Sequence, residues 1–536
     1  MQKYLLLGDE AIAQGAIDAG MSGVYAYPGT PSTEITEYVQ NSKEAQEAGI
    51  HSQWSCNEKT AMESALGMSY AGKRSMVCMK HVGLNVAADP FMNSSITGVN
   101  GGMLIVVADD PSMHSSQNEQ DSRFFGKFAM IPILEPSDQQ QAYDLVHYGF
   151  ELSEKYKFPV LIRLTTRLSH SRAGIIPQKK ISQSELRLPE NLKQFILLPA
   201  LARERYKILL KTQSSFKSES EISGNNSYID GSDKSIGIIA CGLAYNYFLE
   251  VKNTYNLKFP ILKINQYPLP NSMISKIASE TSELLILEEG FPIVEESLRG
   301  FFNAPYTIKG RMDGTIPADG ELNPNIVATA LNIKQDDFAK VPDIVSPRPP
   351  AFCKGCSHAD VYLSLNEAIA PYGKGRVFSD IGCYTLGALP PYDTINSCVD
   401  MGASITMAKG AADAGLFPVV AVIGDSTFTH SGITGLLDVV VENTSITVII
   451  SDNSTTGMTG GQKSSATGRI DQICKGIGVD PDHVITLIPL KKNQTENSQI
   501  IARELEYKGV SVIIAERECI QTAVRHHKEL NKEKKK

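Results

Sequence analysis

The chain has 536 residues, of which 42% are hydrophobic and 21% charged, so it holds enough apolar material for about three globular domains. A formal net charge of −8 gives no reason to expect binding to nucleic acid or to a membrane surface. The apolar run near the N-terminus is too short for a signal peptide, and no segment has about 18 consecutive apolar residues. Nine cysteines in a chain this long do not indicate a disulfide framework, so we expect a cytoplasmic protein with thiols free for metal binding.

Residues 1–212 are expected to form a first α/β domain, because helix-like and strand-like patterns alternate along them. A helix is predicted at 10–19 and a strand at 23–27. The turn that follows, PGTPST at 28–33, includes Thr30 and has the residues of a βα turn with a helix cap. Further strands are predicted at 75–79, 104–108 and 160–164.

Three polar segments of this domain hold further candidate residues. The first, WSCNEK at 54–59, leads into a helix of small residues at 60–71, and its Glu58 can be a helix-start residue favoured by the macrodipole. The second follows the strand at 75–79 and contains His81, and the third, Asp109–Asp121, contains His114. Both histidines are candidate site residues, although a lone loop histidine is more often structural or merely exposed.

Composition divides the rest of the chain. The Ser/Asn/Gly-rich stretch at 213–235 is predicted to be an exposed linker, and a compact α/β pattern at 236–340 predicts a middle domain without catalysis of its own. The Pro-rich stretch at 341–350 predicts a second linker. A third α/β domain is predicted at 351–530, and the Lys-rich tail at 531–536 is expected to be disordered.

The third domain has polar residues just past two predicted strands. The apolar segment at 419–423 ends in Gly424, Asp425 and Ser426, and the apolar segment at 446–450 precedes Asn453. Ligands bind at the carboxyl edge of parallel sheets, and carboxylate and amide oxygens suit Mg²⁺. Gly424 allows a phosphate to approach the backbone, and the helix after it presents N–H groups. An ordinary βαβ unit with Asp and Asn in its turns is the alternative.

Four cysteines are predicted to converge near the same edge. Cys353 and Cys356 form a CxxC motif, while Cys383 and Cys519 each follow a predicted strand, at 377–379 and 510–515. Four thiolates so placed suit Zn²⁺ or an iron–sulfur cluster. The alternative is that Cys383 and Cys519 are small buried hydrophobic residues.

The stretch 424–462 resembles the diphosphate-binding motif of thiamine diphosphate (ThDP) enzymes, in which an Asn follows the Asp of Gly-Asp by 28 residues. Its continuation, TTGMTG at 455–460, resembles the indolepyruvate ferredoxin oxidoreductase family of the 2-oxoacid:ferredoxin oxidoreductase superfamily. The segments 109–121 and 380–386 resemble that family as well.

The resemblance implies a three-domain ThDP-enzyme architecture of class α/β. Residues 1–212 become the pyrimidine-binding domain, 236–340 a transketolase C-terminal-like domain, and 351–530 the diphosphate-binding domain. Parallel sheets are expected in the first and last of these. The motif also implies that Asp425 and Asn453 ligate Mg²⁺ by side chain and Thr455 by its carbonyl. The remaining cofactor contacts that it implies are Gly382, Cys383, Gly402, Ala403, Gly424, Ser426, Thr427, Gly457, Met458 and Thr459.

The resemblance also assigns roles around the reaction. Glu58 would hydrogen-bond the aminopyrimidine ring of ThDP, and Thr30, His81 and His114 would lie near the substrate. Cys353, Cys356, Cys383 and Cys519 would hold a [4Fe–4S] cluster. Two departures stand out: Lys354 replaces the usual proline of the cysteine motif, and the acidic pair at 109–110 stands near where pyruvate-specific relatives carry a carboxylate-binding arginine.

The implied function is oxidative decarboxylation of an aryl 2-oxoacid to its acyl-CoA, with electrons passed to ferredoxin. The family works with a small second subunit, so a heterotetramer is expected. Because no run of closely spaced cysteines follows Cys519, we expect the usual C-terminal ferredoxin-like domain to be missing and electrons to leave to a separate carrier. Two alternatives stay open: a non-oxidative ThDP decarboxylase or lyase, and a non-catalytic ThDP-binding subunit.

Overall fold

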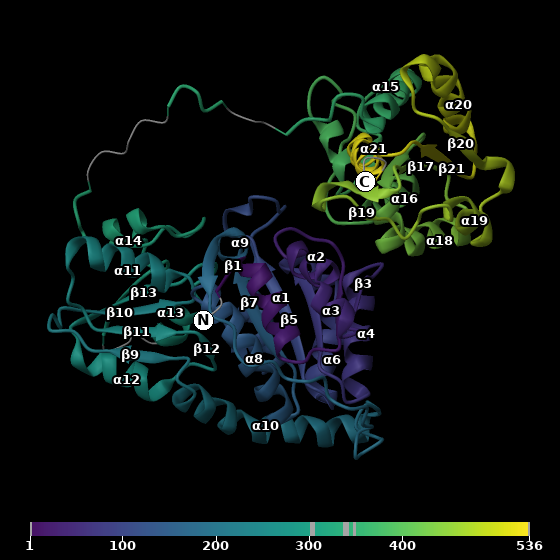
Figure 1. Ribbon diagram of the computed structural model, residues 1–536. Coiled ribbons are helices and arrows are strands. Elements are labelled where there is room, and N and C mark those ends of the chain that lie inside the picture. The colour runs from purple at the N-terminus through teal and green to yellow at the C-terminus, as the bar shows by residue number, and fades with distance from the viewer. Residues whose placement is uncertain (1–2, 301–305, 336–341, 347–349, 534–536) are drawn as a thin grey trace. The chain divides into compact units, whose positions relative to one another are not determined.

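The computed structural model describes residues 3–300, 306–335, 342–346 and 350–533. It divides into two compact units, Met1–Ala339 and Lys340–Lys536 (Figure 1). Among the described residues, no helix is both long enough and apolar enough to cross a bilayer.

The first unit contains a seven-stranded sheet in the order β12-β6-β7-β5-β4-β2-β3, parallel except for β12. Its strands are β2 (Gly23–Ala26), β3 (His51–Trp54), β4 (Ser75–Lys80), β5 (Met103–Asp109), β6 (Ile133–Leu134), β7 (Val160–Thr165) and β12 (Gln266–Tyr267). Beside it, β1 (Tyr4–Leu7) pairs antiparallel with β8 (Arg172–Ile175). Every residue of β4, β5 and β7 is buried, as in parallel sheets covered on both faces.

Helices cover both faces of this sheet. They are α1 (Gly8–Asp18), α2 (Thr33–Asn41), α3 (Lys43–Glu47), α4 (Glu58–Tyr70), α5 (His81–Val86), α6 (Ala88–Thr97), α7 (Ser122–Ala129), α8 (Gln139–Tyr156) and α9 (Thr166–His170). One apolar cluster joins α1 and α8 to alternate residues of the strands, and a second joins α4 and α6 to the others. The sequence periodicity therefore predicted the main elements, with ends shifted by one or two residues.

The middle region forms a second sheet in the order β14-β13-β10-β11-β9, in which only β9 runs antiparallel. Its elements are β9 (Ser227–Ile229), β10 (Ile236–Cys241), β11 (Ile261–Ile264), β13 (Glu283–Leu287), β14 (Thr307–Lys309), α11 (Ala244–Tyr255), α12 (Asn271–Glu280), α13 (Ile293–Arg299) and α14 (Pro324–Ala330). The cluster under α4 continues through Ile239, Leu262 and Ile264 of this sheet. The two sheets therefore share one core.

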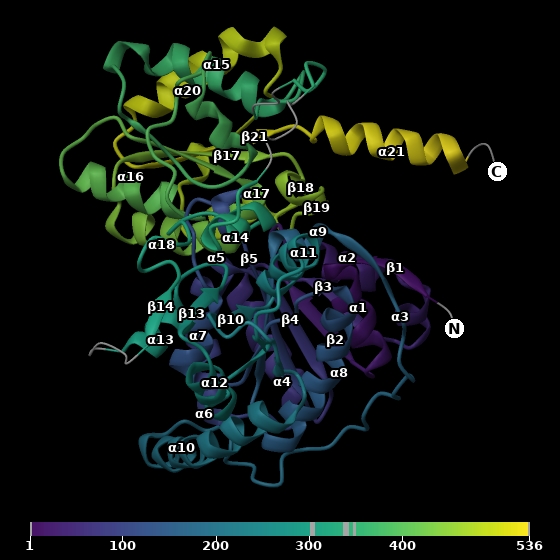
Figure 2. The ribbon, with the colours of Figure 1, turned by 90° about the vertical axis from the view of Figure 1, so that its left-hand side faces the viewer.

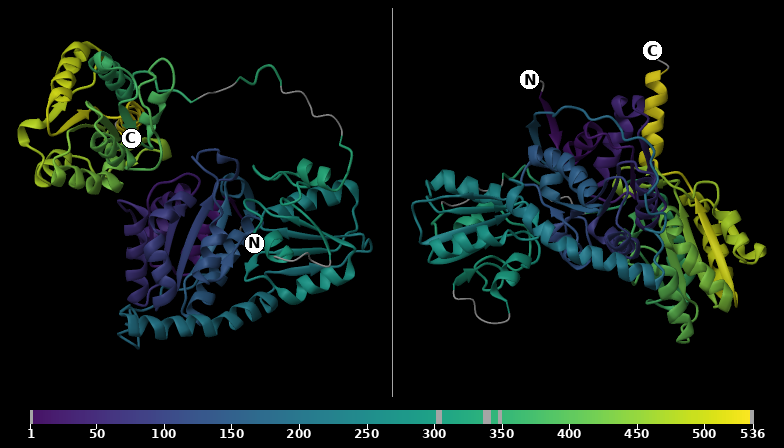
Figure 3. Two further views of the ribbon diagram at one scale, coloured as in Figure 1. Left: turned by 180° about the vertical axis from the view of Figure 1, so that it is seen from behind. Right: turned by 90° about the horizontal axis from the view of Figure 1, so that it is seen from below.

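The stretch 213–235 is not the exposed linker that its composition predicts. Helix α10 (Pro199–Ile222) occupies its first part and β9 its second, and α10 runs beneath both sheets (Figures 1 and 3). The physical reason is that Phe216 is buried against Tyr156 and Phe158, so one face of this Ser-rich helix is apolar. Strand β12, from the predicted middle domain, also joins the first sheet. The unit boundary falls instead beside the second predicted linker, whose residues 342–346 are exposed.

The second unit has a five-stranded parallel sheet in the order β15-β16-β17-β21-β20. Its strands are β15 (Val377–Ser379), β16 (Val420–Gly424), β17 (Ile446–Asp452), β20 (Val484–Leu487) and β21 (Val510–Glu516), with β18 (Thr455–Thr456) and β19 (Gln462–Lys463) as a small antiparallel pair. Its helices are α15 (Ser357–Ile369), α16 (Ala403–Asp413), α17 (Asp425–Thr427), α18 (Ile433–Glu442), α19 (Ile470–Gly476), α20 (Gln494–Glu506) and α21 (Ile520–Glu533).

Helices α15 and α20 pack on one face of this sheet, and α16, α18 and α19 on the other. Helix α21 projects from the rest of the second unit (Figure 2). It includes residues 531–533, so the first half of the predicted disordered tail is helical, and residues 534–536 lie outside the described residues. Parallel sheets with helices on both faces confirm the predicted α/β fold class.

Candidate active site

The carboxyl edge of the second unit's sheet brings the predicted magnesium ligands together. Strands β16 and β17 are parallel neighbours, with Gly424 opposite Ser451, so Asp425 and Asn453 follow adjacent strand ends. Helix α17 begins at Asp425 and continues through a π-helical turn, Phe428–Gly432, into α18. The helix thus starts eight residues earlier than the apolar pattern indicates. Its first N–H groups lie at the strand end, where they favour an anion.

Asp425 is 2% exposed, and its Oδ2 atom has no hydrogen-bond partner within the described chain. Burial, and next the charge of Asp452, raise the pKa of its carboxyl group to about 7. Asn453 is buried beside it, with its Oδ1 atom accepting a hydrogen bond from the Thr455 N–H at 3.1 Å. Two buried oxygen donors, one without a partner, fit a hard divalent cation such as Mg²⁺.

Glycines around this edge lie where a side chain would collide. A Cβ atom on Gly424 would lie 2.6 Å from the Tyr384 ring, and one on Gly402, whose φ is +94°, would lie 2.6 Å from the Ser431 Cβ. A Cβ on Gly457 would lie 3.1 Å from the Cys383 sulfur. Backbone therefore approaches the edge closely, as a diphosphate cradle requires.

The other predicted cofactor residues spread around the same edge. Thr427 donates its hydroxyl to the Ile381 carbonyl at 3.2 Å, and Thr456 donates to the Ser426 hydroxyl at 2.9 Å. Ala403 opens α16 directly after Gly402. Thr459 donates to the Gln462 side chain, whereas Met458 is 59% exposed.

Asp380 is a buried acid that our sequence reasoning did not single out. It follows β15 and accepts hydrogen bonds from Ser404, at 2.5 Å from its hydroxyl, and from the Tyr384 hydroxyl. Burial, partly offset by these bonds, raises its pKa to about 7. Its position after a strand end, like that of Asp425, is the signal that could have identified it. Through Ser404 it fixes the start of α16 next to Gly402.

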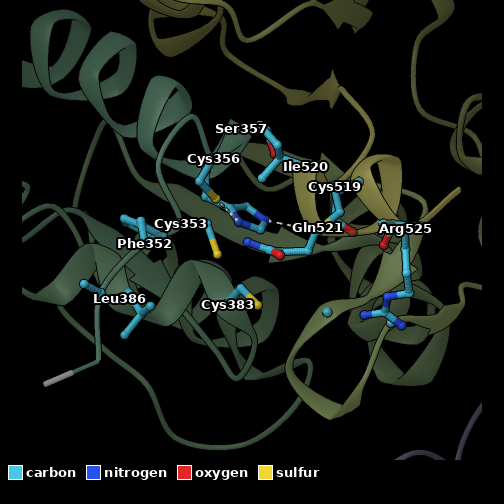
Figure 4. Close-up of a pocket in the computed structure, with 16 residues that line it drawn as sticks. Phe352, Cys353, Cys356, Ser357, Cys383, Leu386, Cys519, Ile520, Gln521 and Arg525 are labelled. Atoms are coloured by element: carbon cyan, nitrogen blue, oxygen red, sulfur yellow. Dashed lines mark hydrogen bonds between the residues drawn. The ribbon is translucent and has the colours of Figure 1, made fainter. Parts of the chain in front are cut away.

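The four predicted cysteines line one cavity of about 110 Å³, together with His358 and Asn453 (Figure 4). They come from the segment before α15, the turn after β15 and the turn after β21. Burial first, and then the other three cysteines, raise the pKa of the Cys383 thiol to about 12. The neighbouring cysteines thus disfavour the thiolate form of Cys383 until a metal compensates its charge. The donor set and its convergence fit a metal centre.

His358, missed by sequence reasoning, lies between the cysteines and Asn453, a predicted magnesium ligand. Its Nδ1 atom lies 3.4 Å from the Cys356 sulfur and its Nε2 atom 3.4 Å from the Asn453 amide nitrogen. Burial, and then the charge of Arg517, lower its pKa to about 4, so the ring is neutral and can accept from the amide. The histidine directly after CxxCS was the available signal.

The first unit gathers another set of predicted residues at its own carboxyl edge. Glu58 opens α4, is 5% exposed, and follows Asn57, whose side chain caps the helix by accepting from the Thr60 N–H at 2.9 Å. A Cβ on Gly83 of α5 would lie 2.5 Å from the Glu58 carboxyl oxygen. The carboxyl group is thus held between two helix N-termini.

The predicted substrate residues fall in different surroundings. Thr30 is half-buried after β2, and its carbonyl accepts from the Ser115 hydroxyl at 3.3 Å. His81 is buried at the start of α5, where its Nε2 atom lies 3.2 Å from the Asn118 carbonyl, and burial lowers its pKa. His114 is exposed and lies 3.4 Å from Glu321 of the middle region. Thr30 and His81 therefore share the edge with Glu58, while His114 faces solvent.

Comparison with known proteins agrees with this geometry. Residues 14–205 match the family model described as pyruvate flavodoxin/ferredoxin oxidoreductase, thiamine diP-binding. Residues 380–514 match the C-terminal TPP-binding domain of thiamine pyrophosphate enzymes. The indolepyruvate oxidoreductase subunit IorA of Archaeoglobus fulgidus is 39% identical over 97% of this chain and 86% of its own length. The chain belongs to the IorA family.

A second IorA subunit and a solved structure extend the comparison. The IorA subunit of Pyrococcus horikoshii is 38% identical over 97% of this chain and 86% of its own length. A 2-oxoglutarate:ferredoxin oxidoreductase from Magnetococcus marinus, solved with 2-oxoglutarate, coenzyme A and succinyl-CoA bound, shares the fold at a TM-score of 0.51 and 18% identity, over 62% of this chain and 65% of its own. This IorA-family chain is therefore an oxidoreductase subunit with ThDP-binding domains.

Proposed function

We propose that this chain catalyses the ThDP-dependent oxidative decarboxylation of an aryl 2-oxoacid such as indolepyruvate. In the balanced reaction, the 2-oxoacid, coenzyme A and two oxidised ferredoxins give acyl-CoA, CO₂, a proton and two reduced ferredoxins. The aryl substrate is supported by the names of relatives 38–39% identical over nearly the whole chain. We propose a small partner subunit in a heterotetramer and action in the cytoplasm.

The convergence of four cysteines on one cavity with Asn453 carries the proposal. A non-oxidative lyase has no use for four thiols beside the diphosphate site. An oxidoreductase that reduces ferredoxin needs a one-electron acceptor there. We assign Cys353, Cys356, Cys383 and Cys519 to a [4Fe–4S] cluster, and Asp425, Asn453 and the Thr455 carbonyl to Mg²⁺.

Bound ThDP supplies a nucleophilic carbon and an electron sink. The chain's own residues prepare the site for it. Glu58 would hydrogen-bond the aminopyrimidine ring, and the glycines Gly382, Gly402, Gly424 and Gly457 would let backbone approach the diphosphate. The N–H groups of Ser426 and Thr427 favour the anion at the start of a helix. Thr30 and His81 would contact the substrate, and Cys383, whose sulfur lies beside Gly457, would hold the electron acceptor.

The test is anaerobic purification with its partner subunit, followed by iron and acid-labile sulfide assay. We expect about four irons per chain in the wild type and their loss in Cys383→Ser. Cys398→Ser is the matched control, because Cys398 is also half-buried near Asp380 but lies outside the cavity lining. If the wild-type protein contains no iron and releases CO₂ and aldehyde without an electron acceptor, the oxidative assignment is wrong and the chain is a decarboxylase.

A further inference from the structure

Lys80, the last residue of β4, is a buried cation without a carboxylate partner. It is 8% exposed, and its Nζ atom donates to the Ser115 carbonyl at 2.6 Å and to the Ser115 hydroxyl at 3.2 Å. In the part of the chain that the structure describes, no carboxylate oxygen lies within 4 Å of this ammonium group. Two of its three donors thus reach neutral oxygens of one residue.

The nearest acid is already occupied by other groups. Asp110 accepts from the Ser115 N–H at 2.8 Å, the Ser116 hydroxyl at 2.5 Å and the Thr166 hydroxyl at 2.7 Å. Burial lowers the pKa of Lys80 to about 8, and the charge of Asp110 offsets only part of that shift. A buried ammonium group held by neutral partners is unfavourable unless an anion joins it.

The surroundings of Lys80 indicate which anion that is. A Cβ on Gly29 would lie 3.2 Å from the Lys80 Cβ, so the turn carrying Thr30 lies directly on this lysine. The Ser115 hydroxyl that Lys80 contacts also donates to the Thr30 carbonyl. Three residues further on, Gly83 packs against Glu58. The junction of β4 and α5 therefore touches both the predicted substrate turn and the predicted catalytic acid.

We propose that the Lys80 ammonium group binds the carboxylate of the 2-oxoacid, an inference that rests on the proposed function. Lys80 supplies, beside the acidic pair at 109–110, the positive charge that binds the carboxylate of a 2-oxoacid. A phosphate of coenzyme A carries similar charge, so the experiment separates these two anions.

The experiment compares Lys80→Met and Lys80→Arg with wild type in the assembled holoenzyme, using phenylpyruvate, coenzyme A and a viologen dye. Loss of a charge-assisted hydrogen bond should raise KM for phenylpyruvate roughly 10- to 100-fold. KM for coenzyme A should not change, and Lys80→Arg should restore part of the affinity. The control is Lys157→Met, which removes an exposed lysine that donates to the Asn100 carbonyl just before β7, at the opposite edge of the sheet.

Calorimetry on the ThDP-free assembly gives a second readout, because phenylpyruvate then binds without reacting. Its affinity should fall in Lys80→Met, and in wild type it should fall about tenfold per pH unit above pH 8. The wild-type profile tests the inference even if Lys80→Met does not fold. Unchanged phenylpyruvate affinity, or a raised KM for coenzyme A alone, overturns it. Wild type that oxidises no 2-oxoacid would instead overturn the proposed function.

Discussion

At the scale of single residues, the carboxyl edges of the two units hold buried ionisable groups whose charged forms destabilise the folded state. Burial raises the pKa values of Asp380 and Asp425 to about 7 and lowers that of Lys80 to about 8. Each shift means that the folded state holds the charged form less well than the unfolded chain does. Such groups at a ligand-binding edge are typical of sites whose ligand supplies the missing partner.

Lys80→Met should therefore stabilise the protein while weakening substrate binding. Because the folded pKa is lower than the ordinary 10.5, the unfolded chain binds more protons between pH 8 and pH 10.5, and stability rises with pH across that window. Removing the charge should add on the order of 3 kcal/mol at pH 7 and abolish that rise. Urea unfolding at pH 7 and pH 10 measures both effects.

Lys475→Met serves as the control, since Lys475 lies at the surface of α19 in an i,i+4 pair with Asp471 and should change stability little. A destabilised Lys80→Met with wild-type pH dependence would contradict the prediction.

At the scale of secondary-structure elements, helices that begin directly at strand ends position the chemistry. Helix α4 opens with Glu58, α5 follows Lys80, and α17 opens with Asp425. The helix N-termini favour the anionic groups and ligands at these points. Where two such helices meet, at Gly83 and Glu58, the absence of a side chain sets the position of the acid.

Gly83→Ala should disturb that meeting without unfolding the chain. The added methyl group would lie 2.5 Å from the Glu58 carboxyl oxygen, so the carboxyl group must move, and activity should fall roughly 100-fold. Steady-state kinetics, together with circular dichroism to verify the fold, measure this effect.

The matched control is Gly67→Ala, on the exposed side of α4, where no atom lies within 4 Å of the new methyl group. It should leave kcat unchanged and stabilise the helix by about 1 kcal/mol. Equal activity in both variants would mean that Gly83 does not position Glu58.

At the scale of the whole molecule, the first two sheets behave as one unit. Two wholly buried arginines bridge them: Arg123 donates to Glu288 at 3.1 Å, and Arg163 donates to the Glu289 carbonyl at 3.0 Å. Together with the shared apolar cluster, these bonds couple the sheets, because separating the sheets would break buried charge-assisted hydrogen bonds and expose apolar side chains.

Limited proteolysis with proteinase K should therefore cut near residues 342–346 before it cuts at 213–235. Ile344 and Val345 are among the most exposed large apolar residues, whereas the Ser-rich stretch forms α10 and β9. Mass spectrometry of the early fragments identifies the site. Early cleavage between 213 and 235 would mean that this stretch is an exposed linker, as its composition alone predicts.

The sequence alone predicted the central strands, the positions of Asp425 and Asn453 after strand ends, Glu58 at a helix start, and the four candidate cysteines, because period, composition and spacing are local properties. It failed at 213–235, where the burial of Phe216 by distant aromatic residues overrides a polar composition. Only the tertiary structure decided that Lys80, Ser115 and the Thr30 turn meet, that His358 lies between Cys356 and Asn453, and that the four cysteines line one cavity. These contacts join residues remote along the chain, and the order of strands in the sheets, which no local pattern encodes, brings them together.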